Sequence, residues 1–192
     1  EEVLLTLMSN IDCVICGDDR FTRKVIESSP RLKVLSKWGT GIDSLDADAC
    51  KSHGVMIRRT RDAFSVPVAE SVLGYILCFT RQLPFMDQAM RQNNWKKMPG
   101  RVFEECTLGV IGVGDVGKTV VRRAVVLGMP VLGNDIIKIP EAFLKETGVA
   151  MVSKEELLCR ADFVSLHTDL NPTSHHLMSD REFELMNQSA VI

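Results

Sequence analysis

The sequence has no excess of positive charge and no long apolar run. Its 192 residues include 23 lysines and arginines against 25 aspartates and glutamates. A chain without net positive charge has no field that would hold nucleic acid or an anionic membrane non-specifically. The apolar runs are broken by Glu70, Arg81 or glycine well before the about 20 residues that a membrane-spanning helix needs. We therefore expect neither a nucleic-acid nor a membrane partner.

The six cysteines lack the spacing of a disulfide framework. Cys13 and Cys16 form a close pair, but no second Cys or His pair is placed to complete a metal site. Both lie in a predicted strand, whose period of two sends them to opposite faces. We expect reduced structural thiols, no metal and a cytoplasmic setting. The chain also lacks an initiator Met, a targeting pattern and a clear closing signal after Ala190, so we expect both ends to be cuts.

Hydrophobic residues make up 45% of the sequence and charged residues 25%, which is typical of a folded chain with a core. Short apolar runs alternate with helix-like segments, which indicates βα units around a parallel sheet. We predict strands at 11–16, 32–36, 55–57, 107–111, 131–134, 163–166 and 189–192. We predict helices at about 20–28, 45–52, 66–79, 116–127, 154–159 and 180–186. The helix at 66–79 is apolar on nearly every side, which predicts burial between domains or subunits.

The most informative stretch places G-x-G-x-x-G at Gly112, Gly114 and Gly117, directly after a β-branched strand and at the start of a helix. The first glycine permits a tight turn, the second allows the backbone to approach a pyrophosphate, and the third allows close helix–strand packing. The phosphates would then lie on free N–H groups at the helix N-terminus. The pattern predicts a dinucleotide site.

An acidic residue stands where such a site requires one. Asp135 ends the next predicted strand, 18 residues beyond Gly117, where a carboxylate accepts hydrogen bonds from the adenosine ribose. Its charge would repel a 2′-phosphate, which favours NAD over NADP. The alternative interpretation is a turn residue that caps the strand.

Four motifs, in order, resemble those of the D-isomer-specific 2-hydroxyacid dehydrogenases, with D-3-phosphoglycerate dehydrogenase-like members nearest. They are the substrate-loop stretch 32–46, the helix start 66–70, the nucleotide fingerprint 107–135 and the strand-end segment 161–170. The resemblance implies an α/β fold, in which an incomplete Rossmann-type sheet (63–192) follows a partial flavodoxin-like substrate domain (1–62). It implies an NAD-dependent oxidoreductase acting on a small D-2-hydroxy or 2-keto acid, and a homodimer formed through the helix at 66–79.

The resemblance also implies roles for individual residues. Thr40 would approach the nicotinamide, and the amides near Gly39 and Gly41 would face a substrate carboxylate. Further cofactor contacts would come from Asp115 and Val116 along the pyrophosphate, and from His167 and Thr168 beside the cofactor cleft. Glycines suit the first loop because backbone donors without a Cβ can approach an anion closely.

Two departures from the family's pattern limit what the resemblance implies. The loop Gly17–Arg20 carries two carboxylates where phosphoglycerate enzymes have a polar or basic loop, which argues against a phosphorylated substrate. The family's catalytic arginine, glutamate and histidine would lie beyond residue 192, so we assign no catalytic residue and expect the chain to be inactive. Alternative interpretations are His167 as a substitute base, a metal pair at His175 and His176, and an NAD-binding corepressor or sensor without turnover.

Overall fold

The computed structural model describes residues 1–192 and divides into two compact units. The first comprises Glu1–Ala63 with Asp169–His175, and the second comprises Phe64–Thr168 with His176–Ile192. The sequence division at residue 62 placed residues 169–175 in the second domain, whereas they contact the first unit. None of the helices combines the length and the apolar character that crossing a membrane requires.

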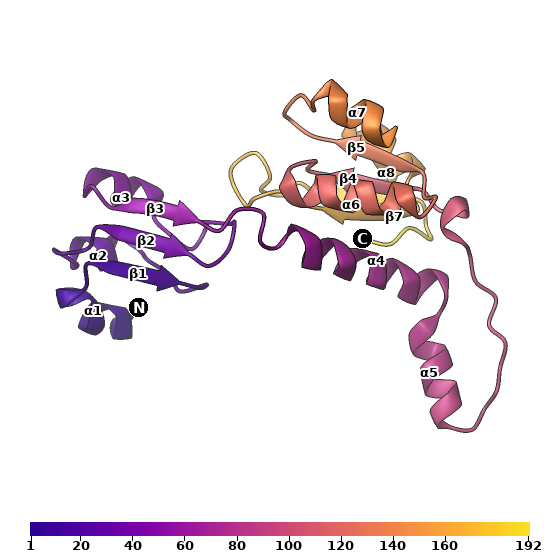
Figure 1. The fold of residues 1–192 in the computed structure, drawn as a ribbon, viewed down its shortest axis with the longest axis horizontal. Coiled ribbons are helices and arrows are strands. Elements are labelled where there is room, and N and C mark those ends of the chain that lie inside the picture. The colour runs from indigo at the N-terminus through magenta and orange to yellow at the C-terminus, as the bar shows by residue number, and fades with distance from the viewer. The chain divides into compact units, whose positions relative to one another are not determined.

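The first unit is a three-stranded parallel sheet with helices on one face (Figure 1). Its elements are α1 (Glu2–Leu7), a 3₁₀ turn (Met8–Asn10), β1 (Cys13–Cys16), α2 (Arg23–Glu27), β2 (Val34–Lys37), α3 (Ala47–Ser52) and β3 (Met56–Arg59). The strands follow the order β1-β2-β3, with Val14 beside Leu35 and Leu35 beside Ile57. Cys16 is buried and Cys13 is exposed, as the strand period predicts.

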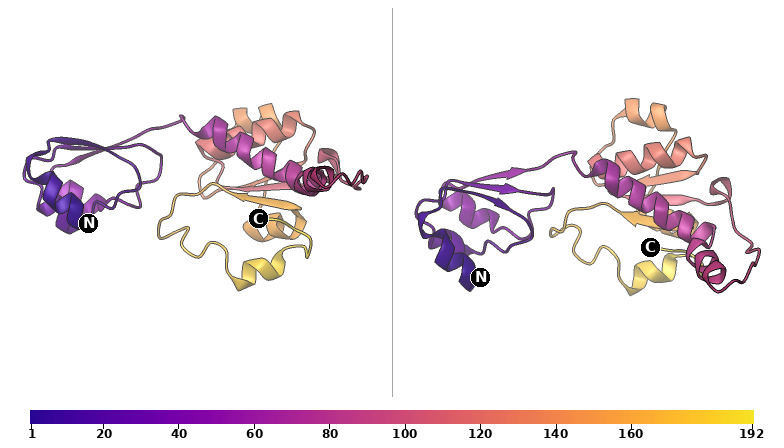
Figure 2. Two further views of the ribbon diagram at one scale, coloured as in Figure 1. Left: turned by 90° about the horizontal axis from the view of Figure 1, so that it is seen from below. Right: turned by 60° about the horizontal axis from the view of Figure 1, so that its bottom comes forward.

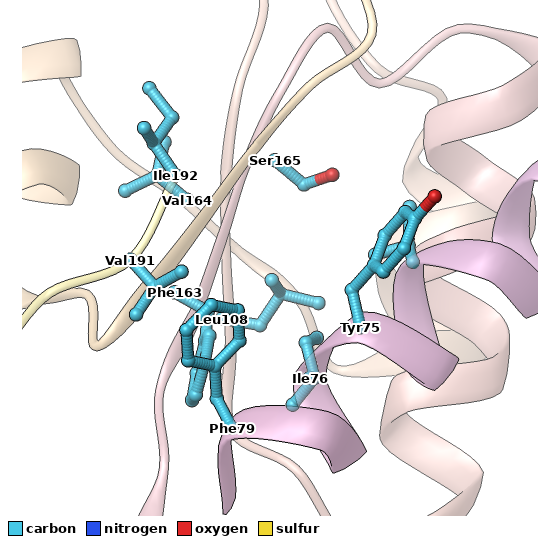
Figure 3. A pocket seen from close by; sticks show the side chains of 10 residues that line it. Tyr75, Ile76, Phe79, Leu108, Phe163, Val164, Ser165, Val191 and Ile192 are labelled. Atoms are coloured by element: carbon cyan, nitrogen blue, oxygen red, sulfur yellow. The ribbon is translucent and has the colours of Figure 1, made fainter. Parts of the chain in front are cut away.

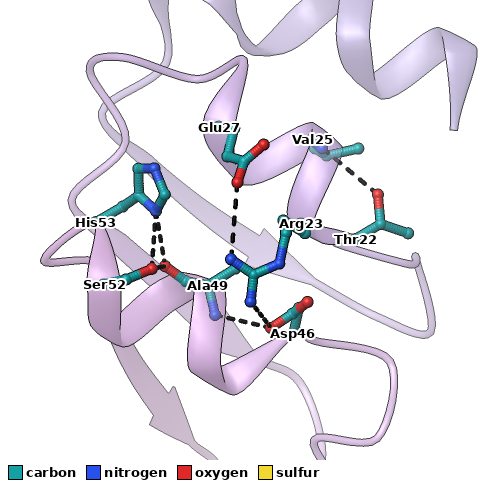
Figure 4. A network of polar contacts seen from close by, with 8 residues as sticks. All are labelled: Thr22, Arg23, Val25, Glu27, Asp46, Ala49, Ser52 and His53. Carbon is teal, nitrogen blue, oxygen red and sulfur yellow. Dashed lines mark hydrogen bonds and ion pairs between the residues drawn. The ribbon is translucent and has the colours of Figure 1, made fainter.

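Side-chain caps explain where α2 and α3 begin (Figure 4). The Thr22 hydroxyl accepts a hydrogen bond from the Val25 amide at the start of α2. The Asp46 carboxylate does the same for Ala49 at the start of α3, and it also pairs with Arg23 at 3.8 Å. These caps satisfy N–H groups that have no partner within the helix. They fix the loops that precede both helices.

The second unit is a four-stranded parallel sheet of order β6-β5-β4-β7, covered on both faces (Figure 2). Its elements are α4 (Ser65–Thr80), α5 (Leu83–Arg91), a 3₁₀ turn (Phe103–Glu105), β4 (Leu108–Ile111), α6 (Asp115–Val126), β5 (Val131–Asn134), α7 (Glu141–Thr147), β6 (Ala150–Met151), α8 (Lys154–Arg160), β7 (Phe163–Leu166) and α9 (Asp180–Leu185). Helices α4 and α6 pack on one face, and α8 packs on the other. This is half of a Rossmann-type fold, as predicted.

Within this chain the helix predicted at 66–79 is buried on one side only, so the expected burial between domains or subunits stays a prediction. Helix α4 buries one stripe, which includes Ala69, Leu73 and Ile76. Its other side leaves Tyr75 68% and Phe79 58% exposed. The sheet and α6 reach only one side of the helix, so an apolar face remains uncovered.

Two further expectations need correction. The run 189–192 forms a single parallel bridge between Val191 and Phe163 rather than a strand. The sequence interpretation also missed α1, α5, α7 and β6. Of these, α1, α7 and β6 are short, whereas α5 has a helical apolar period in Leu83, Met86 and Met90 that could have predicted it.

Candidate functional site

The three glycines of the fingerprint differ in what surrounds them. Gly112 has a φ of +89°, and a Cβ there would lie 2.5 Å from the His167 carbonyl oxygen. A Cβ at Gly117 would lie 2.0 Å from the carbonyl oxygen of Gly112. A Cβ at Gly114 would meet nothing within 4 Å. The first and third glycines are therefore required by the protein's own packing, while the second faces open space.

That open space lies at the N-terminus of α6. Gly114 is the N-cap residue, and the first helical hydrogen bond is donated by Lys118 to the Gly114 carbonyl. The preceding amides of the first turn, including those of Asp115 and Val116, have no partner within the helix. The helix dipole adds a partial positive charge at this end. The turn can therefore bind an anionic group through its backbone.

Asp135 is connected directly to this turn. Its Oδ2 accepts a hydrogen bond of 2.6 Å from the Val113 amide, and its Oδ1 accepts one of 2.8 Å from the Ile137 amide. The hydrogen bond from Ile137 forms the turn at the strand end that the alternative interpretation predicts. The hydrogen bond from Val113 joins the carboxylate to the glycine fingerprint. Each carboxylate oxygen keeps a further lone pair. Both can accept from a sugar hydroxyl beside the bound phosphates.

The end of β7 borders the same turn. The His167 amide donates a 2.8 Å hydrogen bond to the Ile111 carbonyl, and Thr168 lies against Gly112. The His167 ring is half-buried, and its Nε2 lies 2.9 Å from the Ser165 hydroxyl. Burial lowers the pKa of His167, so the imidazole is uncharged at neutral pH. The structure thus brings the fingerprint, Asp135, His167 and Thr168 together in the second unit.

The predicted substrate-loop residues form a separate group in the first unit, where β2 ends. Gly39 has a φ of +152°, and its carbonyl accepts a 3.1 Å hydrogen bond from the Thr60 amide. The Thr40 carbonyl accepts a 3.3 Å hydrogen bond from Arg59 Nη1. The loop containing Gly41 is therefore held at the carboxyl ends of parallel strands, where open α/β sheets bind ligands.

Lys37 lies beneath this loop and was missed by the sequence interpretation. Its side chain is 5% exposed. The ammonium donates to the Gly17 carbonyl at 2.5 Å, to Asp18 Oδ1 at 2.9 Å and to the Ser44 hydroxyl at 3.2 Å. The sequence signal that could have indicated its role is a lysine at the end of a strand, two residues before Gly39.

The remaining histidines lie on other segments of the chain. His53 ends α3, where its Nδ1 lies 3.0 Å from the Ala49 carbonyl and 3.1 Å from the Ser52 hydroxyl (Figure 4). His176 has a φ of +55° in the loop that follows β7. No group of three or more His, Cys, Asp or Glu residues is arranged to hold a metal ion.

An apolar pocket of about 270 Å³ lies on the second unit, apart from the fingerprint residues (Figure 3). Tyr75, Ile76 and Phe79 of α4 line one side, opposite Phe163 of β7 and Val191. The Phe79 and Phe163 ring centroids are 6.5 Å apart. The pocket has no charged side chain, so it does not resemble a nucleotide or carboxylate site.

The fold and the fingerprint geometry define a dinucleotide-binding α/β domain of the Rossmann type. A sequence model described as "D-isomer specific 2-hydroxyacid dehydrogenase, NAD binding domain" matches residues 73–192. The chain therefore belongs to the D-isomer-specific 2-hydroxyacid dehydrogenase family, and its residues 73–192 match the family's NAD-binding domain. The predicted family, fold class and cofactor are confirmed at this level.

Individual relatives agree with this assignment. The chain is 35% identical over 196 residues to a D-3-phosphoglycerate dehydrogenase of Methanocaldococcus jannaschii, covering 100% of this chain and 37% of the relative. It is 26% identical to a glyoxylate reductase of Thermococcus litoralis, covering 99% and 60%. The crystal structure of an Aquifex aeolicus D-lactate dehydrogenase complexed with NAD and lactic acid superposes with a TM-score of 0.90 at 27% identity, covering 97% and 57%. The chain thus spans between about a third and three fifths of the length of these relatives.

Proposed function

We propose that this chain supplies the cofactor-binding and substrate-positioning part of an NAD-dependent D-2-hydroxyacid dehydrogenase. The observation that supports the proposal is the hydrogen bond from the Val113 amide to Asp135, because an acid beside the open N-terminus of α6 can accept from the ribose of a dinucleotide. When bound there, NAD supplies the hydride acceptor for carbon 2 of the hydroxy acid. The relatives act on lactate, glyoxylate or phosphoglycerate, as their names state.

The protein's own part in this reaction is binding and orientation. The first-turn amides of α6 hold the pyrophosphate, Asp135 accepts from the ribose hydroxyls, and His167 and Thr168 border the cofactor. The backbone around Gly39 and Gly41 binds the substrate carboxylate, and Thr40 contributes on the nicotinamide side. Hydride transfer also needs a group that takes the hydroxyl proton. His167 is poorly suited to the role of proton acceptor, because burial lowers its pKa and its Nε2 is hydrogen-bonded to the Ser165 hydroxyl.

Titration with NADH tests the proposal directly. The 192-residue chain is expected to enhance and blue-shift NADH fluorescence with saturation, and Asp135→Asn is expected to weaken the binding. A folded wild-type chain that leaves NADH fluorescence unchanged would overturn the cofactor site. In separate cuvettes, 2-keto acids with NADH and D-2-hydroxy acids with NAD⁺ are both expected to give no turnover above blank.

We also propose that α4 forms a homodimer contact and that the protein works in a reducing compartment such as the cytoplasm. The exposed apolar residues Val66, Tyr75 and Phe79 support the first point, because such a surface is costly in water and suits a partner. The six free cysteines support the second. Sedimentation velocity tests the dimer, and a strict monomer at micromolar concentration would overturn it.

A further inference from the structure

The ammonium group of Lys37 is a buried cation at the candidate substrate edge. Lys37 ends β2, on the same face of the strand as the core residue Leu35. With 5% of its side chain exposed, it has little access to water. A buried cation is costly unless it is hydrogen-bonded and paired with an opposite charge. The groups hydrogen-bonded to the Lys37 ammonium therefore decide whether it can bind an anionic group of a ligand.

All three donor positions of the ammonium are used, and only one partner is charged. Gly17 supplies a carbonyl and Ser44 a hydroxyl, while Asp18 supplies a carboxylate at 2.9 Å. The Asp18 side chain is otherwise fully exposed. It is therefore the one partner that can leave without disturbing the core. A carboxylate or phosphate oxygen of a ligand could take the same place on the lysine.

This cation lies close to the loop assigned to the substrate carboxylate. A Cβ on Gly39 would be 3.4 Å from Cε of Lys37, so the lysine stem lies directly against that glycine. The Lys37 carbonyl also accepts a 3.0 Å hydrogen bond from the Thr60 hydroxyl, beside the bond from Thr60 to Gly39. A ligand held at Gly39–Gly41 would thus have its other end within reach of the Gly17–Arg20 loop.

We propose that Asp18 is a specificity-determining residue. Its carboxylate is a built-in counter-ion that occupies Lys37 and keeps a second anionic group of the ligand out. The substrate class is then a 2-hydroxy or 2-oxo monocarboxylic acid whose remaining substituent carries no charge. This inference rests on the proposed function for its substrate class, but the occupation of Lys37 by Asp18 is tested without it.

Inorganic phosphate is the probe for Lys37 itself. In the 192-residue chain, the amide signals of Gly17, Asp18 and Lys37 are followed by ¹H–¹⁵N NMR during titration with phosphate. Asp18→Asn keeps an oxygen for the lysine but removes the charge, so it is expected to tighten phosphate binding at least about 10-fold. The matched control is Asp19→Asn, which makes the same change in net charge one residue away and is expected to leave the affinity within about 3-fold of wild type.

The double variant Asp18→Asn/Lys37→Met separates the cation from the loop. It is expected to bind phosphate no better than wild type, because the cation is gone, and its circular dichroism spectrum verifies folding. Equal phosphate affinity in wild type and Asp18→Asn, or equal gains in Asp18→Asn and Asp19→Asn, would overturn the proposal.

A matched pair of ligands, D-glycerate and its 3-phosphate ester, tests the substrate class. Glycerate is expected to shift the Gly39–Gly41 signals in wild type and Asp18→Asn alike, and the ester is expected to gain at least about 10-fold in Asp18→Asn only. If glycerate shifts none of these signals, the proposed substrate site fails, while the phosphate result still decides the role of Asp18. If the ester binds wild type as well as glycerate does, the substrate class is wrong.

Discussion

Substituting the glycines of the fingerprint one at a time separates folding from cofactor binding. In Gly117→Ala, the new Cβ would lie 2.0 Å from the Gly112 carbonyl oxygen, which belongs to a fixed turn. Overpacking of this kind costs about 3 kcal/mol at the upper end of its range. Alanine returns about 1 kcal/mol of helix preference inside α6. We expect the free energy of unfolding to fall by about 2 kcal/mol.

Gly114→Ala is expected to behave in the opposite way. Its φ of −78° suits any L-residue, and its Cβ would meet nothing within 4 Å. Alanine is a poorer N-cap than glycine, so the loss of stability should stay below about 1 kcal/mol. The Cβ would, however, project where a pyrophosphate approaches the backbone. We expect NADH affinity to fall at least about 10-fold.

Urea unfolding followed by circular dichroism, together with NADH titration, measures both effects. Gly74→Ala is the control for helix preference, because Gly74 lies inside α4 with nothing within 4 Å of its added Cβ. It should stabilise the chain by up to about 1 kcal/mol. The reasoning on packing is refuted if Gly117→Ala is as stable as Gly74→Ala. The reasoning on the phosphate site is refuted if Gly114→Ala binds NADH as wild type does.

Three further predictions concern single side chains. Asp135→Asn should weaken NADH binding about 10-fold. It should also reduce the ratio of NADH affinity to NADPH affinity, because the charge that repels a 2′-phosphate is gone. Fluorescence titration with both cofactors measures the two affinities. The pKa of Glu182 is lowered from 4.5 to about 2, first by the Ser179 hydroxyl and then by Lys154. The stabilisation is therefore complete above pH 4.5 and lost as the pH falls toward 2; urea midpoints should show a shallower acid decline for Glu182→Gln. Tyr75→Asp should shift a dimer to monomer in sedimentation velocity without loss of helix signal.

The fingerprint was predictable because its requirements are local. Gly112 is needed for the positive φ of the turn, and Gly117 for its close approach to the Gly112 carbonyl, so their spacing alone predicts the turn. The contact of Gly112 with the His167 carbonyl comes from a distant strand and is not part of this local signal. Asp135 adds a contact 22 residues away, with Val113. That contact was also predictable, because consecutive parallel strands end at the same edge of a sheet.

Lys37 could not be predicted in the same way. Its sequence neighbours predict a strand, but burial of its ammonium depends on the pairing of β1 with β2, which sets Cys16 beside Lys37 and brings the next residues, Gly17 and Asp18, over the lysine. A lysine near a strand end is usually solvated, so the pattern gave no reason to expect a buried pair. Helix α4 was predicted from its sequence, but the surface that covers its apolar side was not. Its apolar character indicates that something covers it but does not identify the covering surface.

The pairing of Lys37 with Asp18 changes the argument about a phosphorylated substrate. Counted by sequence, Asp18 and Asp19 face only Arg20, which predicts simple repulsion of a phosphate. With Lys37 included, the loop region carries two charges of each sign, and repulsion no longer decides. What decides is competition, because Asp18 is tethered next to Gly17, which binds the same ammonium, and so it has a high effective concentration. A ligand phosphate must displace this tethered group. If competition by Asp18 excludes the phosphate, removing the Asp18 carboxylate alone abolishes the exclusion. If net charge excluded the phosphate, removing the carboxylate of Asp18 or that of Asp19 would weaken the exclusion equally.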